Sequence, residues 1–302
     1  MKGDCEELRR TVRRLKKDYD FRGLLHFTDF LNLSSIISVG YLCSRDLCYA
    51  NNIDFVDSFK QNTIHHTSKE LINFTRFYYV EKNNVNYMEN LAIPVYLLFS
   101  EEIICLSLAT FSDGDADSKY SKYGADYEFF NYVIDWEVVF DKNIVQHSLN
   151  GPVKQSMVRK RRSELLIDEP VPLNYLKNII FRCNADFKRA CNLFGKSKLY
   201  LVEPHMFFNE KNYIKDYNIV YNKLIDSDVF VLHFSSNLPV ENNEKHQYGL
   251  YDLNDKLIRK TGVTFIESSN TEFNVEVNNI PDYPVKFKFW FYGVLSIEET
   301  IG

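Results

Sequence analysis

The sequence predicts an α+β fold. Apolar runs of strand length and segments with helical spacing occur in mixed order along the 302 residues. Hydrophobic residues make up 45% of the chain and charged residues 25%, which is typical of a globular protein with a core. Only 11 Gly and 8 Pro are present, so long disordered linkers are not expected.

Local signals predict the individual elements. Residues 5–18 form a helical, basic segment, and the apolar run 24–27 is a short strand. A helix follows, with Asp29 or Asn32 as its N-terminal cap and Gly40 as its end. Further expectations are a segment at 68–79 that fits helix or strand, strands at 94–99, 103–108, 164–167, 176–181, 229–234 and 287–292, a polar loop at 112–126, an ordered piece from 135 and a helix at 187–194.

Composition narrows the class of protein. The chain has no run of about 18 apolar residues, so no membrane span is expected. The first ten residues, MKGDCEELRR, lack the apolar stretch of a signal peptide, so the expected location is the cytoplasm. The six cysteines form no CxxC pair and show no zinc spacing, so they are expected to be reduced, buried residues, with no metal bound.

A basic stretch precedes a single glutamate. From Lys142 to Ser163 there are six Lys or Arg and no acid, although the chain carries a net charge of -5. We expect the stretch to be a loop that attracts polyanions, and a carboxylate that opens a strand beside such a loop predicts chemistry on a nucleic acid. The alternative is a solvated basic face before an ordinary strand. The predicted nucleic-acid-binding residues are Lys154, Arg159, Lys160, Arg161 and Arg162, and the glutamate is Glu164.

Three other residues are candidates for binding a dinucleotide. His26 and Thr28 fall on one side of their strand, just before a helix, which suits the hydroxyls and amide of such a ligand. The alternative for His26 is a core histidine bonded to a backbone carbonyl. Arg76 lies among aromatic residues, where it can clamp a phosphate or extend to the surface. The chain has no Walker loop, GxGxxG or HExxH motif, which disfavours nucleotide hydrolysis and Rossmann chemistry.

Taken in order, three segments resemble the DarT family. They are His26-Phe27-Thr28-Asp29-Phe30-Leu31-Asn32-Leu33-Ser34-Ser35-Ile36-Ile37 with Gly40 and Leu42, Thr110 to Ser118 followed by Asp135-Trp136, and Arg159-Lys160-Arg161-Arg162-Ser163-Glu164-Leu165-Leu166-Ile167. The resemblance runs from about 22 to 185. DarT proteins are toxins that take ADP-ribose from NAD and attach it to a base in single-stranded DNA.

The resemblance implies an ADP-ribosyltransferase fold, a split and mostly antiparallel β core with surrounding helices. The transferase domain would cover 1–204, and 205–302 would be an extension of extra strands and helices or a small subdomain. His26, Thr28 and Asn32 would bind NAD, the co-substrate, with Arg76 as the central arginine. Glu164 would be catalytic. The family's Pro-Arg-x-Pro-Met stretch is absent near Arg76, which indicates a divergent member.

The implied reaction suits these residues. A carboxylate such as Glu164 can hold a ribose hydroxyl, stabilise the charge that develops on the ribose and take the proton of the attacking base. No metal is needed. The expected acceptor is single-stranded DNA, with RNA as an alternative, and the expected partner is an antitoxin of macrodomain type. A transferase acting on protein, or a non-catalytic nucleic-acid-binding protein, remains open at this point.

Overall fold

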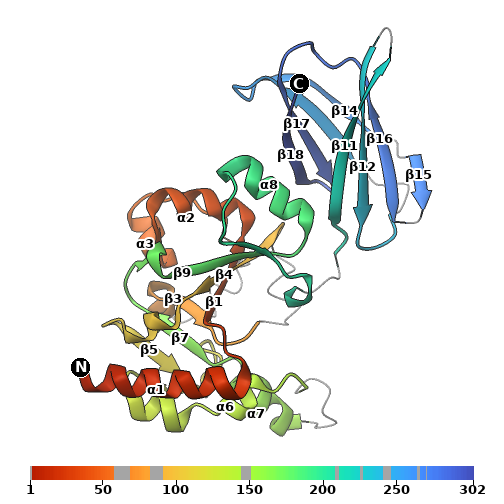
Figure 1. Cartoon of the computed structure of the whole chain (residues 1–302). Coiled ribbons are helices and arrows are strands. Elements are labelled where there is room, and N and C mark those ends of the chain that lie inside the picture. Colours follow the sequence, from red (N-terminus) through yellow and green to blue (C-terminus); the bar gives the residue numbers. More distant parts are fainter. Residues whose placement is uncertain are drawn as a thin grey trace. The chain divides into compact units, whose positions relative to one another are not determined.

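The protein is described from a computed structural model (Figure 1). Its chain divides into two compact units, Met1–Ile179 and Ile180–Gly302. The domain boundary expected at 204/205 stays a prediction. The structure describes residues 2–57, 69–81, 91–143, 151–207, 211–224, 227–240, 246–263, 266–269 and 271–302.

The core of unit 1 is a sheet with the strand order β9-β4-β1-β3-β7-β5-β6 (Figure 1). From β4 to β6 the neighbouring strands run antiparallel. The predicted α+β class with a mostly antiparallel core is thereby confirmed. The strands are β1 (Leu24–Asp29), β3 (Thr75–Tyr78), β4 (Pro94–Phe99), β5 (Ala109–Ser112), β6 (Tyr123–Gly124), β7 (Glu164–Ile167) and β9 (Leu176–Phe181), with a separate pair of β2 (Tyr41–Leu42) and β8 (Val171–Pro172).

The sheet splits between β1 and β3. β1 pairs with β4 along its whole length, from Leu24 to Asp29, whereas it meets β3 at Leu25 opposite Tyr78. His26 and Thr28 therefore lie on the part of β1 that is paired with β4 but not with β3. A gap in a sheet leaves room for a ligand between two strands that are each held on their other side.

Helices surround this sheet, and several follow from local sequence signals. In α1, Leu8, Val12 and Leu15 are buried at helical spacing. Gly40 ends α2 with a left-handed φ of 77°, as its sequence position predicts. Within the described residues, the α-helices of unit 1 are α1 (Lys2–Tyr19), α2 (Leu33–Val39), α3 (Arg45–Ala50), α6 (Trp136–Phe140) and α7 (Gly151–Arg161).

Two sequence predictions about local structure are wrong. The apolar run 103–108 is not a strand: a 3-10 helix covers Glu101–Cys105, and Ser100 caps it by accepting from the Glu102 N–H. The basic stretch before Glu164 is not a loop but the helix α7. In the ambiguous segment 68–79, a 3-10 helix at Lys69–Asn73 precedes the strand β3, and residue 68 lies outside the described residues.

The cysteines are not all reduced. Cys5 in α1 and Cys105 form a disulfide, with their Cα atoms 5.5 Å apart. The two residues are 100 positions apart in the chain, so no spacing motif signals the bond. Cys43, Cys48, Cys183 and Cys191 are free thiols.

Unit 2 consists of α8 (Asn184–Phe194), the short strand β10 (Tyr200–Val202) and two four-stranded sheets (Figure 1). The sheets pack through one apolar cluster that includes Phe230, Phe273, Phe287 and Phe289. Unit 2 therefore contains a β-sandwich. One sheet has the order β11 (Ile214–Leu224), β12 (Ser227–Ser236), β16 (Glu272–Val277), β15 (Ile266–Ser269), and the other β14 (Leu257–Gly262), β13 (Gln247–Tyr251), β17 (Val285–Phe291), β18 (Val294–Ile301).

Candidate active site

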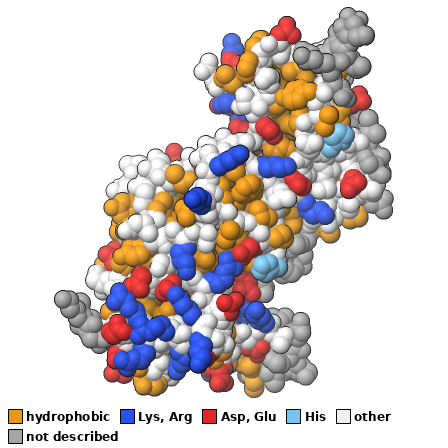
Figure 2. Space-filling model, in the orientation of Figure 1, with side chains coloured by type: hydrophobic (Ala, Val, Ile, Leu, Met, Phe, Trp, Pro, Cys, Tyr) orange, Lys and Arg blue, Asp and Glu red, His pale blue; other side chains and the backbone are white. Residues whose placement is uncertain are grey.

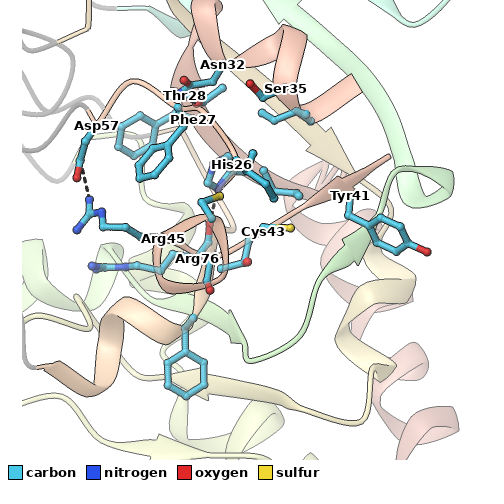
Figure 3. Close-up of a pocket in the computed structure, with 18 of the residues that line it drawn as sticks. His26, Phe27, Thr28, Asn32, Ser35, Tyr41, Cys43, Arg45, Asp57 and Arg76 are labelled. Carbon is cyan, nitrogen blue, oxygen red and sulfur yellow. Dashed lines mark hydrogen bonds and ion pairs between the residues drawn. The ribbon is translucent and has the colours of Figure 1, made fainter. Parts of the chain in front are cut away.

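A pocket occupies the split in the sheet (Figure 3). Its lining comes from β1, α2, β2, α3 and β3, so that segments far apart in sequence meet around one space. Most of the lining residues are apolar or aromatic, and polar side chains lie among them, as is usual for small-molecule sites. The polar and charged lining residues are His26, Thr28, Asn32, Ser35, Ser44, Arg45, Asp57, Thr75 and Arg76.

His26 has one ring nitrogen fixed by the backbone. Its Nδ1 lies 2.9 Å from the carbonyl oxygen of Arg76, and because a carbonyl can only accept, Nδ1 carries the proton. Burial lowers the pKa of His26 to about 4, against the opposing effect of this hydrogen bond. The ring is neutral at pH 7, and Nε2 is an acceptor. The backbone bond expected of a core histidine is present, and the same ring lines the pocket.

Thr28 and Asn32 are linked to each other. Asn32 Nδ2 donates to Thr28 Oγ1 at 2.9 Å and to the carbonyl of Val56 at 3.1 Å, while Asn32 Oδ1 accepts from the Val56 N–H at 2.6 Å. The amide of Asn32 is therefore engaged through both its oxygen and its nitrogen. Thr28 accepts from Asn32, which leaves its own hydroxyl proton for another partner. In this arrangement Asn32 orients Thr28 and holds the segment around Val56.

Arg45 and Asp57 form an ion pair on the wall of the pocket (Figure 3). Arg45 Nη2 lies 3.0 Å from Asp57 Oδ1, and the side chains are 18% and 21% exposed. Neither residue is predicted as a site residue from the sequence. The only sequence signal is that Arg45 begins α3, directly after Ser44, which caps that helix by accepting from the Leu47 N–H.

Arg76 and Glu164 are brought together by the pairing of β3 with β7. Arg76 Nε donates to Glu164 Oε2 at 2.6 Å, and Arg76 Nη2 donates to Oε1 at 2.8 Å. Burial alone would lower the pKa of Arg76, but Glu164, Tyr78 and Asp117 raise that pKa well above its usual range. Arg76 therefore keeps its positive charge. Its two parallel hydrogen bonds to Glu164 make the pair bidentate, which is the strongest geometry for an arginine–carboxylate contact.

Glu164 lies behind Arg76 as seen from the pocket. Arg76 lines the pocket, whereas Glu164 is not among the lining residues and its side chain is 0% exposed. Besides the two arginine contacts, Glu164 Oε1 accepts from the Ala116 N–H at 3.1 Å. A carboxylate with three donors and no exposed surface has to exchange a partner before it can contact a ligand.

The segment 112–118 covers this ion pair. Asp117 Oδ2 accepts from Arg76 Nη1 at 2.8 Å, and Asp115 Oδ1 lies 3.8 Å from Arg76 Nη2. Gly114 lets the segment approach α7, because a Cβ there would lie 2.3 Å from Arg159 Nη1 and 3.0 Å from the Arg159 carbonyl. The polar loop expected at 112–126 is thus an ordered cover over Glu164, and it contains the short strand β6.

The cations of the predicted nucleic-acid-binding stretch contact acids from other parts of the chain. Figure 2 shows Lys and Arg side chains mixed with Asp and Glu on the part of unit 1 that contains α1. The side chains of Arg159 and Arg161 are 15% and 12% exposed, and those of Lys160 and Arg162 are 36% and 28% exposed. Lys154 is half-buried. The ion pairs are Arg159–Asp113 at 2.9 Å, Lys160–Asp135 at 2.9 Å, Arg161–Glu81 at 3.9 Å and Arg162–Asp115 at 3.1 Å.

Exposed tyrosines lie beside the covering segment. Tyr120 is 70% exposed and Tyr123 is 45% exposed, so neither is a core residue. The Tyr123 hydroxyl donates to the carbonyl of Ala116, next to the amide that holds Glu164. These rings are flat surfaces close to the candidate site, where an unpaired base can stack.

Two findings concern metals and membranes. Across the described ranges, no group of three or more His, Cys, Asp or Glu side chains is arranged to hold a metal ion. None of the helices in the described part of the chain has the length and apolarity needed to cross a bilayer.

Comparison with known proteins identifies similar chains. The family model "ssDNA thymidine ADP-ribosyltransferase, DarT" matches residues 25–208. Thermosipho africanus DarTG, solved with ADP-ribose, is 14% identical at a TM-score of 0.52 over 65% of this chain and 53% of that one. Thermus sp. 2.9 DarT, solved with ADP-ribosylated ssDNA, is 11% identical at a TM-score of 0.48 over 61% of this chain and 95% of that one. No curated protein matches.

Proposed function

The chain belongs to the DarT family of ssDNA thymidine ADP-ribosyltransferases, and from this premise we propose that it attaches ADP-ribose to thymidine in single-stranded DNA with the pocket at the sheet split as its NAD site. NAD-dependent transfer to single-stranded DNA is the activity of the family, and it decides against the protein-modifying and non-catalytic alternatives. The observation that supports the location is that Arg76, which holds Glu164 behind it, lines the same pocket as His26 and Thr28.

In this proposal, His26 and Thr28 bind the nicotinamide–ribose part of NAD, where the bond is broken. Nε2 of the neutral His26 ring accepts a hydrogen bond from a ribose hydroxyl or from the carboxamide N–H. The Thr28 hydroxyl, oriented by Asn32, donates to an oxygen of the same ligand. Asn32 is a positioning residue in this arrangement, because its amide is already occupied by Thr28 and Val56.

Arg76 and Glu164 change partners when NAD binds. The diphosphate of NAD offers Arg76 an anionic partner. When Arg76 turns toward the diphosphate, it releases the carboxylate of Glu164, which can then contact the ligand. Cleavage of the nicotinamide–ribose bond develops positive charge on the ribose. Glu164 then holds a ribose hydroxyl, stabilises that charge and accepts the proton that the base nitrogen loses as its bond to the ribose carbon forms. The cover segment around Ala116 has to release Oε1 for this step.

The basic stretch keeps part of its predicted role. Lys154 and Lys160 remain partly exposed, and we assign them to phosphates of the acceptor strand. The three arginines hold the cover segment and neighbouring acids in place. In a filter-binding titration, Lys154→Gln with Lys160→Gln should flatten the salt dependence by about 0.7 per lost phosphate contact. An unaltered slope in a folded double variant would exclude the lysines from the DNA site.

We propose an antitoxin as the protein partner, of the macrodomain type that removes ADP-ribose. This rests on the family resemblance, not on a feature of the described surface. A macrodomain protein encoded beside this chain should restore growth to cells that express the active enzyme, and it should release ADP-ribose from modified DNA. Rescue of growth without release of ADP-ribose would indicate an antitoxin that blocks the enzyme directly.

A test of the proposed site uses matched variants of one charged cluster. Glu164→Gln should abolish transfer of label from NAD to a single-stranded oligonucleotide, while Asp117→Asn, which also removes a carboxylate beside Arg76, should retain transfer. Binding of NAD to both variants, followed by calorimetry, shows that the pocket is intact. Transfer by Glu164→Gln at the wild-type rate would remove this residue from the mechanism.

A further inference from the structure

One outer face of the unit 2 sandwich differs from the other in chemistry. In β17 the residues alternate between buried and half-buried, so that Phe287, Phe289 and Phe291 face the core while Lys286, Lys288 and Trp290 face outward. The sequence pattern of lysines alternating with aromatics allowed an exposed strand or a binding face. The proposed reaction in unit 1 does not explain why lysines and aromatic residues alternate in this strand.

Two aromatic rings form the centre of this face. Tyr251 of β13 and Trp290 of β17 lie with ring centroids 6.3 Å apart. Gly249 lies under them: a Cβ at Gly249 would be 2.7 Å from Cε2 of Tyr251 and 3.4 Å from Cζ3 of Trp290. Gly249 is buried although it points outward, because the two rings cover it. The strand thus has a glycine where any side chain would displace the rings.

Lysines surround the rings. Lys260 Nζ lies 4.4 Å from the Trp290 ring centroid, and Lys288 Nζ lies 5.0 Å from that of Tyr251. Among the described residues no carboxylate forms an ion pair with Lys260, which is exposed. Lys286 Nζ pairs with Asp255 at 2.6 Å, and Asp255 is 51% exposed. Lys288 Nζ lies 2.9 Å from Asp255 Oδ1 and 3.0 Å from Glu298 Oε1, so two carboxylates offset part of the positive charge beside the rings.

The opposite outer face is a natural contrast. There the two central strands, β12 and β16, present Val231, His233, Glu272 and Glu276 outward, with neither lysine nor large aromatic ring, while the edge strand β11 contains the exposed Lys215 and Tyr221. The two faces share one core and one fold, so the fold alone does not require the aromatic and basic set. The difference between the two faces is explained if the face with aromatic rings and lysines binds a ligand.

We infer that the outer face of β13, β14 and β17 binds single-stranded DNA, with Tyr251 and Trp290 as stacking platforms and Lys260 and Lys286 as phosphate contacts. Unpaired bases stack on aromatic side chains without regard to sequence, and lysines beside them neutralise the backbone. A neutral glycan also stacks on such rings, but it carries no charge for the lysines to neutralise, whereas the phosphates of a single strand do. A duplex hides its base faces from the rings.

This inference rests on the proposed function, because it gives the acceptor strand a second contact outside the catalytic unit. Binding to a flat face of this kind is insensitive to sequence, so it adds affinity for long single strands rather than selection of a base. The catalytic pocket chooses the nucleotide, and the sandwich face increases the local concentration of the strand.

The test measures binding of the full chain to a fluorescent single-stranded oligonucleotide by anisotropy, without NAD. Trp290→Ala and Tyr251→Ala should each weaken binding by roughly fivefold or more, the effect of losing one stacked base. Lys260→Glu, an exposed change with little risk to folding, should also weaken binding and flatten the salt dependence by about 0.7. Asp255→Asn should tighten binding, because it frees Lys286 and removes a charge that repels phosphate.

The matched control is His233→Ala on the opposite face, which should bind as the wild type does. Unchanged affinity in both Lys260→Glu and Asp255→Asn would overturn the inference, as would competition by a neutral oligosaccharide or equal binding of duplex. NAD cleavage without DNA is measured in parallel and should be unaffected by Lys260→Glu. Wild-type chain that binds DNA through this face but transfers no ADP-ribose would count against the proposed function alone.

Discussion

Replacing Glu164 by alanine should destabilise unit 1 as well as abolish transfer. The change leaves Arg76, which is 13% exposed, with a buried charge that has lost its bidentate partner. Breaking a buried pair costs about 3–5 kcal/mol, and the lower end applies here because Asp117 still contacts Arg76 at 2.8 Å. The Ala116 N–H also loses its acceptor, so the loss in free energy of unfolding is about 3 kcal/mol or somewhat more.

For a unit of this size, about 3 kcal/mol corresponds to a fall in Tm of roughly 6–12 °C. Differential scanning calorimetry measures it, and the transition of unit 2 is an internal reference. The double change Arg76→Leu with Glu164→Leu should be less destabilised than Glu164→Ala, because it leaves no unpaired charge. A Tm for Glu164→Ala equal to that of the wild type would mean that the ion pair is absent in solution, and the account of a buried resting state would fail.

Three further outcomes are expected. His26→Ala should raise KM for NAD by roughly 5- to 150-fold, as expected from the loss of one or two hydrogen bonds, and leave DNA affinity unchanged, which steady-state kinetics and anisotropy would show; an unchanged KM would restrict His26 to a core role. The pKa of His26 in the folded protein is about 4, below its usual 6.5. The contribution of His26 to the free energy of unfolding is therefore complete above pH 6.5 and is lost as the pH falls toward 4. Urea melts between pH 4 and 7 should show that the free energy of unfolding falls more steeply with decreasing pH in the wild type than in His26→Ala. The triple change Arg159→Gln, Arg161→Gln and Arg162→Gln should lower Tm, because it removes the ion pairs that hold the cover segment in place; an unchanged Tm in calorimetry would show that these arginines do not anchor the cover.

The sequence predicts the elements that local signals define. The strand at Leu24, the helix that ends at Gly40 and the alternation in β17 follow from periodicity and capping, which depend on neighbours in the chain. Glu164 is recognisable because it opens an apolar strand directly after a run of cations. These features are predictable because the residues that define them are close together in the chain.

The remaining features depend on residues far apart in the chain. The basic stretch appears unpaired in sequence, yet Asp113, Asp115 and Asp135 reach it from segments that precede it by 25 to 47 positions. The same applies to Arg45 with Asp57 in the pocket wall, and to the disulfide between Cys5 and Cys105. A count of charges within one window cannot show partners that tertiary structure supplies.

The measurement that tests the central claim most directly is transfer of label from NAD to four matched acceptors: single-stranded DNA with thymidine, the same strand with every thymidine replaced, the duplex, and RNA of the same sequence. We expect label on the thymidine-containing single strand, much less on the duplex because unpairing a base costs a few kcal/mol, and none with Glu164→Gln. Equal label on the strand that lacks thymidine would refute the proposed base. Label on the thymidine-containing single strand with Glu164→Gln would contradict the proposed mechanism.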